Sequence, residues 1–158
     1  MISLKKRLLT GMMATSLFLG LCVGAQALAG ENGFVSVQSS SSYEDTVAKL
    51  RQLVAKNGMM VLGEINQGKV MTNMTGMNLK AISLFVGNPN VGKKLFSADA
   101  GVGIVLPVRV NVFERSNGTY INYFKPSEQL KPFHERKLVM MGTKLDKKLA
   151  NMTGMLGH

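Results

Sequence analysis

The sequence predicts an α+β fold, a two-layer sandwich in which helices pack on a mixed, mainly antiparallel sheet, with a C-terminal amphipathic helix added. Three observations predict it. The chain has 158 residues of which 46% are apolar, enough to bury one core. Segments with the two-residue period of strands alternate with segments of helical period. Asn117–Gly118 joins two strand segments as a tight hairpin turn.

The first 29 residues have the pattern of a cleaved secretory signal peptide. Residues 5–7 are Lys-Lys-Arg, an apolar run follows over 8–23, and residues 25–29 offer small side chains for cleavage. The apolar run is shorter than the roughly 20 residues that a membrane span requires, which argues against an anchor. We therefore expect cleavage after Ala29 and a periplasmic or secreted mature chain.

Export changes what the composition means. The net charge is +10, from 19 basic and 9 acidic residues, and three of the basic residues belong to the predicted signal. The single cysteine, Cys22, belongs to it too, so the mature chain is expected to have neither a disulfide nor a catalytic thiol. His134 and His158 alone are a poor basis for a histidine metal site or a Ser/His/Asp triad. Export and the lack of an aromatic-basic platform argue against nucleic acid as a partner.

The elements of the mature chain follow from local patterns. Residues 33–38 alternate in period two and predict a strand. A helix with Ser41 or Ser42 as N-cap follows, and Asn57–Gly58 is its stop signal. The later elements are a strand at 59–65, a helical or irregular crossover at 68–78, a buried strand at 81–86, a short helix through Lys93, Leu95 and Phe96, and hairpin strands at 104–114 and 119–125. Pro107 predicts that its strand lies at a sheet edge or a bulge.

Several short motifs occur together between residues 33 and 134. They are Leu-Phe-Val-Gly-Asn-Pro at 84–89, Gly92, Leu-Pro-Val-Arg-Val at 106–110, Tyr123, Pro126 and His134. Taken together, they resemble the domain of unknown function 302 family. The resemblance implies a small α+β domain over 30–134, often dimeric, with no established activity. Where the family usually carries an Asp-His pair, this chain has Asn66–Gln67, so no acid–base or metal role is expected there.

The loop that follows the buried strand is the centre of the candidate binding site. Gly87–Lys93 matches the G-x-x-x-x-G-K pattern of phosphate loops, but Lys94 stands where Mg²⁺ binding requires Ser or Thr. A broader role in binding a small anionic ligand at a helix N-terminus stays open. The candidate ligand-binding residues are Asn88, Gly92, Lys93, Arg109 and His134. Each of three of these residues also has a purely structural interpretation. Asn88 would belong to a turn that ends the strand, Arg109 would be an exposed or paired strand residue, and His134 would be a cap.

Methionine usage supports an alternative function, a periplasmic Cu(I)-binding protein. The pentapeptide Asn-Met-Thr-Gly-Met occurs at 73–77 and again at 151–155. Thioether sulfur is a soft ligand that suits Cu(I). The metal ligands would be Met71, Met74, Met77, Met152 and Met155. Flexible core filling or an adaptable interaction surface is the competing interpretation, because no His or Cys accompanies the sulfurs within the motif.

Residues 135–158 predict a basic amphipathic helix. Its apolar positions recur at helical spacing and are Leu138, Met141, Leu145, Leu149, Met152 and Leu156. Gly142 and Gly154 are expected to weaken it. The apolar face is expected to pack on the domain or on a second copy, with peripheral contact to an anionic membrane surface as the alternative.

No motif in the sequence indicates a particular reaction, and we predict no catalytic residue. The sequence as a whole therefore predicts an exported, non-catalytic domain that binds a small ligand or a partner, needs no cofactor unless it binds Cu(I), and forms a homodimer.

Overall fold

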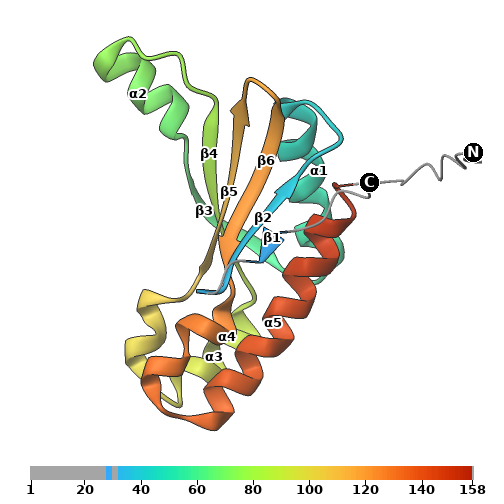
Figure 1. The fold of residues 1–158 in the computed structure, drawn as a ribbon. Helices are drawn as coiled ribbons and strands as arrows, with labels where there is room; N and C mark the ends of the chain where they lie inside the picture. The colour runs from blue at the N-terminus through green and yellow to red at the C-terminus, as the bar shows by residue number, and fades with distance from the viewer. Residues whose placement is uncertain (1–27, 30–31, 158) are drawn as a thin grey trace, which may run out of the picture.

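The fold is one antiparallel sheet with helices packed on one face, as the computed structural model shows for residues 28–29 and 32–157 (Figure 1). Most of the predicted signal peptide lies outside these described residues. The strands are β1 (Leu28–Ala29), β2 (Phe34–Gln38), β3 (Met60–Ile65), β4 (Ala81–Gly87), β5 (Val108–Arg115) and β6 (Gly118–Phe124). The α-helices are α1 (Tyr43–Lys56), α2 (Gln67–Thr75), α3 (Pro89–Phe96), α4 (Pro126–Gln129) and α5 (Arg136–Gly154). Two 3₁₀ helices are η1 (Ala100–Ile104) and η2 (Lys131–Phe133).

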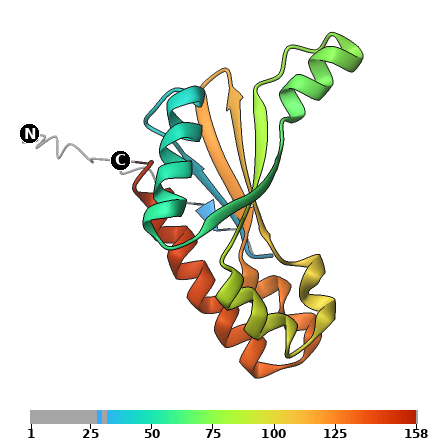
Figure 2. The same cartoon turned by 180° about the vertical axis from the view of Figure 1, so that it is seen from behind.

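The sheet has the order β1-β2-β6-β5-β4-β3. The two-layer α+β class is confirmed. Every pairing among the described strands is antiparallel, so the parallel pair that a mixed sheet implies is not found there. Figures 1 and 2 show α2 projecting beyond one end of the sheet, while α3 and α4 lie at the other end.

Local signals fix several element boundaries, and the first of them, at Ser42, lies where the sequence predicts it. The Ser42 side chain caps α1 by accepting a hydrogen bond from the Asp45 backbone N–H at 3.2 Å. Asn66 caps α2 in the same way, accepting from the Lys69 N–H at 2.8 Å. Gly76 ends α2 with a φ of 73°, a left-handed conformation that glycine adopts without steric cost.

Side chains from one face of the sheet form the main core with α1 and α5. The members of the core from the central strands include Leu84, Val86, Val108, Val110, Val112 and Ile121. Leu149, Met152 and Leu156, at the C-terminal end of the chain, belong to the same cluster. The apolar face of the C-terminal helix is therefore packed on the domain and belongs to the same core as the sheet.

Pro107 does not mark an edge strand. It precedes the first residue of β5, which lies between β4 and β6 in the interior of the sheet. Because β5 begins at Val108, the missing N–H of proline falls outside the hydrogen-bonded ladder. The start of the predicted strand, around Ile104, is instead the end of η1, which the Asp99 side chain caps at the Gly101 N–H.

The sheet edge at β1 consists of the last two residues of the predicted signal. Leu28 pairs with Ser36 and Ala29 with Val35. Cleavage after Ala29 would remove β1 and leave β2 as the edge strand. Across the described ranges of the chain, no helix combines the length and the apolar character needed to cross a membrane.

Candidate functional site

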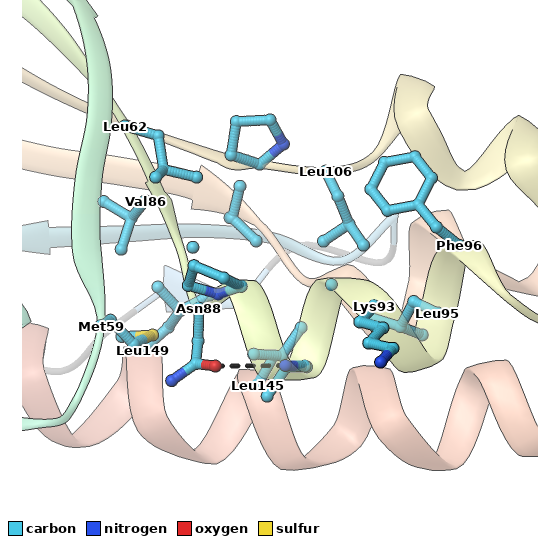
Figure 3. A pocket seen from close by; sticks show the side chains of 16 residues that line it. Met59, Leu62, Val86, Asn88, Lys93, Leu95, Phe96, Leu106, Leu145 and Leu149 are labelled. Atoms are coloured by element: carbon cyan, nitrogen blue, oxygen red, sulfur yellow. Dashed lines mark hydrogen bonds between the residues drawn. The ribbon is translucent and has the colours of Figure 1, made fainter.

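A cavity of about 270 Å³, which we call the apolar pocket, lies on the helix-covered side of the sheet (Figure 3). Leu62 of β3, Leu106 before β5, and Leu145 and Leu149 of α5 contribute to its lining. Asn88 and Lys93 are the polar side chains of this lining. The pocket therefore offers an apolar surface with a narrow choice of polar contacts, as binding sites for small molecules commonly do.

The Asn88 side chain stabilises the backbone around the apolar pocket, and both its amide oxygen and its amide nitrogen are already hydrogen-bonded. Its Oδ1 accepts hydrogen bonds from the backbone N–H groups of Asn90 at 2.9 Å and Val91 at 3.1 Å, which makes it the N-cap of α3. Its Nδ2 donates to the Gly58 carbonyl at 2.5 Å. Figure 3 draws one of these bonds as a dashed line. Asn88 thus fastens the start of α3 to the turn before β3.

The phosphate-loop pattern does not produce an open anion site at α3. The Asn88 side chain already accepts from two N–H groups of the first turn, so the chain caps its own helix. Gly92 and Lys93 follow in the next turn and both line the apolar pocket. Lys93 is exposed and forms no salt bridge with any described residue, so a cation lies at the edge of an otherwise apolar surface.

A second cavity, of about 440 Å³, opens on the opposite face of the sheet, and we call it the open-face pocket. Arg109, Asn111 and Asn122 supply polar side chains to it, and Phe34 and Phe124 are among its apolar ones. The structure thus separates Arg109 from Asn88, Gly92 and Lys93, with which the sequence groups it. Pro107 lines both pockets and stands between them.

Hydrogen bonds fix the side chains at the polar edge of the open-face pocket. Ser83 is fully buried, and its hydroxyl accepts from Gln67 Nε2 at 2.5 Å and from Arg109 Nε at 3.1 Å. The same hydroxyl lies 3.2 Å from Asn111 Oδ1 and donates to it. Gln67 Oε1 is buried without a hydrogen-bond partner among the described residues. Sequence reasoning missed Ser83, Asn111 and Asn122, although polar residues alternating with buried ones along a strand were a signal for a second, solvated face.

His134 lies outside both pockets. It ends η2 with a φ of 54°, and its backbone N–H donates to the Lys131 carbonyl at 3.0 Å. Its side chain is exposed. These contacts agree with the capping role and do not bring His134 together with the other candidate ligand residues.

The structure does not bring the candidate copper ligands into one group. Met74 and Met77 are exposed on and beside α2, with Met71 half-buried near them. Met152 is completely buried in the main core, and Met155 is exposed at the end of α5. Figures 1 and 2 show α2 well away from the C-terminal end of α5. No cluster of three or more His, Cys, Asp or Glu side chains that could hold a metal occurs in the described part of the chain.

The lining of either pocket lacks carboxylate, imidazole and thiol groups. These are the side chains that most often transfer protons or attack a substrate. The arrangement of these described residues is therefore suited to holding a molecule by apolar contact, hydrogen bonds and positive charge.

Comparison with known proteins gives a family and a fold. The family model for the domain of unknown function DUF302 matches residues 35–156, which includes α5. No curated protein matches significantly. A solved structure, of an uncharacterized conserved DUF302 protein from Bacillus stearothermophilus, is similar with a TM-score of 0.73 and 20% sequence identity. The similarity covers 78% of this chain and 98% of that one, and at this identity it supports the shared fold.

Proposed function

Since this chain belongs to the DUF302 family, defined by a domain of unknown function, we propose from its own residues that it is an exported, non-catalytic binding domain. Its ligand is a small, predominantly apolar molecule held in the apolar pocket. The observation that carries the proposal is a cavity of about 270 Å³ whose lining is apolar except for Asn88 and Lys93. Burying apolar ligand surface there is favourable by about 25 cal/mol for each Å² removed from water.

The position of the two polar residues narrows the ligand further. Both amide atoms of Asn88 are engaged by Gly58 and by the first turn of α3. Lys93 is the one charged side chain in this lining, and it is exposed. A polar group on the ligand would therefore point outward, toward the Lys93 ammonium group, while the apolar body lies between α3 and α5.

The test is a titration with indole, followed by two-dimensional NMR of the ¹⁵N-labelled protein. Indole probes the apolar contacts of the pocket alone, because its N–H is a donor and cannot accept a hydrogen bond from the Lys93 ammonium group. We expect chemical-shift changes at Met59, Leu106 and Leu145. Val91→Trp should fill the pocket and abolish these changes. Asn90→Trp is the matched control, because Asn90 lies on the same helix, is exposed and does not line the pocket.

Two results would contradict the proposal. Indole shifts that persist unchanged in the Val91→Trp variant would place the ligand elsewhere. Turnover by the wild-type protein in a panel of hydrolase and oxidoreductase substrates would show that the domain is an enzyme.

Export is part of the proposal and rests on the sequence of residues 1–29. Its support is the basic start, the apolar run and the small residues that precede Gly30. Sequencing the N-terminus of the protein recovered from the periplasm or medium should begin at Gly30. A chain that stays in the cytoplasm with an intact N-terminus would refute this part.

The proposal also includes a homodimer. Apolar side chains are exposed along the edge strand β3 and the helix that follows it, namely Met60, Leu62, Ile65, Val70 and Met74. Such clustered exposure is typical of surfaces that bind a second protein. Light scattering should give twice the chain mass, and the double variant Val70→Lys, Met74→Lys should give a monomer.

Copper binding remains the alternative function, now restricted to α2 and the loop after it. Met71, Met74 and Met77 lie there close in sequence, and two of them are exposed. Anaerobic Cu(I) titration against a competing chelator decides it. Equal affinity of the wild type and a variant with the three methionines changed to leucine would remove this alternative.

A further inference from the structure

The strand register arranges the open face of the sheet in two transverse rows. One row is polar: Ser83 of β4 pairs with Asn111 of β5, which pairs with Asn122 of β6, which pairs with Ser36 of β2. In the adjacent row, Phe85 pairs with Arg109, and Phe124 pairs with Phe34. Residues from both rows line the open-face pocket. The pocket thus places a strip of neutral hydrogen-bonding groups beside a strip of aromatic rings that contains one cation.

Arg109 is oriented but not neutralised. Its Nε donates to the buried hydroxyl of Ser83 at 3.1 Å, and Ser83 is held in turn by Gln67 and Asn111. No carboxylate among the described residues lies within ion-pair distance of Arg109. Its other guanidinium N–H groups have no hydrogen-bond partner within residues 28–29 and 32–157. A fixed guanidinium with free donors is the side chain best suited to bind a carboxylate.

The walls of the open-face pocket favour a flat apolar body next to that carboxylate. The rings of Phe34 and Phe124 meet edge to face with their centroids 5.4 Å apart, and both are partly exposed. Ile104 of η1 is 87% exposed and also lines the pocket. These side chains give an organic ligand apolar contact, whereas inorganic phosphate could use the polar groups of the lining but would leave these apolar side chains without a partner.

We propose that the open-face pocket is a second ligand site, which binds a small aromatic carboxylate. The carboxylate accepts hydrogen bonds from the Arg109 guanidinium, Asn111 and Asn122 add neutral polar contacts, and the ring lies against Phe34 and Phe124. This site is on the opposite face of the sheet from the apolar pocket, so it does not depend on the function proposed for that pocket.

The experiment is a calorimetric and NMR titration of the full mature chain with benzoate. We expect shift changes centred on Arg109, Asn122 and Phe124. Arg109→Gln should weaken binding about tenfold or more, because a hydrogen bond to a charged partner contributes roughly 1.5–3 kcal/mol. Arg109→Lys should be intermediate, since lysine keeps the charge and loses the planar fork. Benzyl alcohol, with the same ring and no charge, should bind as weakly as benzoate binds to the Arg109→Gln variant.

Arg115→Gln is the matched control. Arg115 lies on the same strand and the same face, and its substitution removes the same charge, but its guanidinium lies over the Phe113 and Tyr120 rings outside the pocket. It should bind benzoate like the wild type. Benzoate affinity that survives both Arg109 variants, or that falls equally in Arg115→Gln, would overturn the proposal. Phosphate binding as tight as benzoate binding would overturn the aromatic class, and shifts centred on Lys93 would assign benzoate to the apolar pocket.

Discussion

The two faces of the sheet use the same strands for opposite purposes. Along β5, Val108, Val110 and Val112 are buried under α1 and α5, whereas Arg109 and Asn111 alternate with them on the open face. The covered face obtains its stability from apolar area removed from water. The open face has polar and aromatic side chains, and hydrogen bonds link Ser83 with Arg109 and Asn111 there. The alternation along this strand therefore places every second side chain in the core and the side chains between them on the open face.

The pockets follow this division. The apolar pocket lies where the helical layer meets the end of the sheet, between α3 and α5, so its surface has the composition of a core. The open-face pocket lies where η1 and α4 flank the uncovered side of the sheet, so its surface mixes aromatic, amide and guanidinium groups. The difference shows that the chemistry of each pocket is set by the face of the sheet from which it is built.

Substitutions at two neighbouring residues of β4 should show the largest difference in unfolding free energy between the two faces of the sheet. Leu84 is completely buried in the core, and its neighbour Phe85 is half-buried on the open face. Leu84→Ala should lower the free energy of unfolding by about 3 kcal/mol, within the range for a truncated core leucine. Phe85→Ala should lower it clearly less, although it removes more atoms. Urea unfolding monitored by circular dichroism measures both, and an equal loss would contradict the division of the two faces.

A smaller loss of stability is expected where two helices of the covering layer, α4 and α5, pack against each other. A Cβ added to Gly142 of α5 would lie 2.7 Å from the backbone N and Cα of Ser127 in α4. Gly142→Ala should therefore destabilise the protein by about 2 kcal/mol, because a close backbone contact cannot yield as a flexible side chain does. Gly154→Ala is the control in the same helix, since a Cβ there meets nothing within 4 Å. It should change stability by less than about 1 kcal/mol, in the stabilising direction. Similar losses in the two variants would show that α4 and α5 do not pack this closely.

The elements and their caps were predictable because their signals are local. Ser42 precedes acidic residues and a helical apolar repeat, and it is the N-cap of α1. Asn117–Gly118 lies at the turn between β5 and β6. The glycines of α5 show what such local signals do not predict. Sequence alone presents Gly142 as a weak point, whereas the fold uses it as the point where α5 approaches α4, a contact between segments that helical spacing does not encode.

The candidate site was less predictable because it depends on strand pairing. Asn88 and Arg109 belong to neighbouring motifs of one family pattern, which led to a single predicted site. In the sheet, Val86 pairs with Val108 on the covered face, while Phe85 pairs with Arg109 on the open face. A shift of one residue along a strand exchanges the two faces. Only the register therefore shows that these two residues serve different pockets.

The smallest expected effect is a pH dependence that comes from the covered face. Tyr123 is 3% exposed within the core, and burial raises the pKa of its hydroxyl, with Thr153 opposing and Asp146 adding to the shift. Above about pH 10, the unfolded chain loses this proton while the folded chain still holds it. The unfolded state then binds fewer protons than the folded state, so stability falls as the pH rises through this window.

Tyr123→Phe should remove this part of the alkaline loss. We expect the unfolding temperature of the wild type to fall more steeply than that of Tyr123→Phe between about pH 9 and pH 11. Both proteins share the loss that comes from their other titrating groups, so the difference between the two slopes isolates Tyr123. Parallel slopes would mean that its hydroxyl reaches water in the folded protein. The covered face would then be less closed at its β6 end than the burial of Tyr123 indicates.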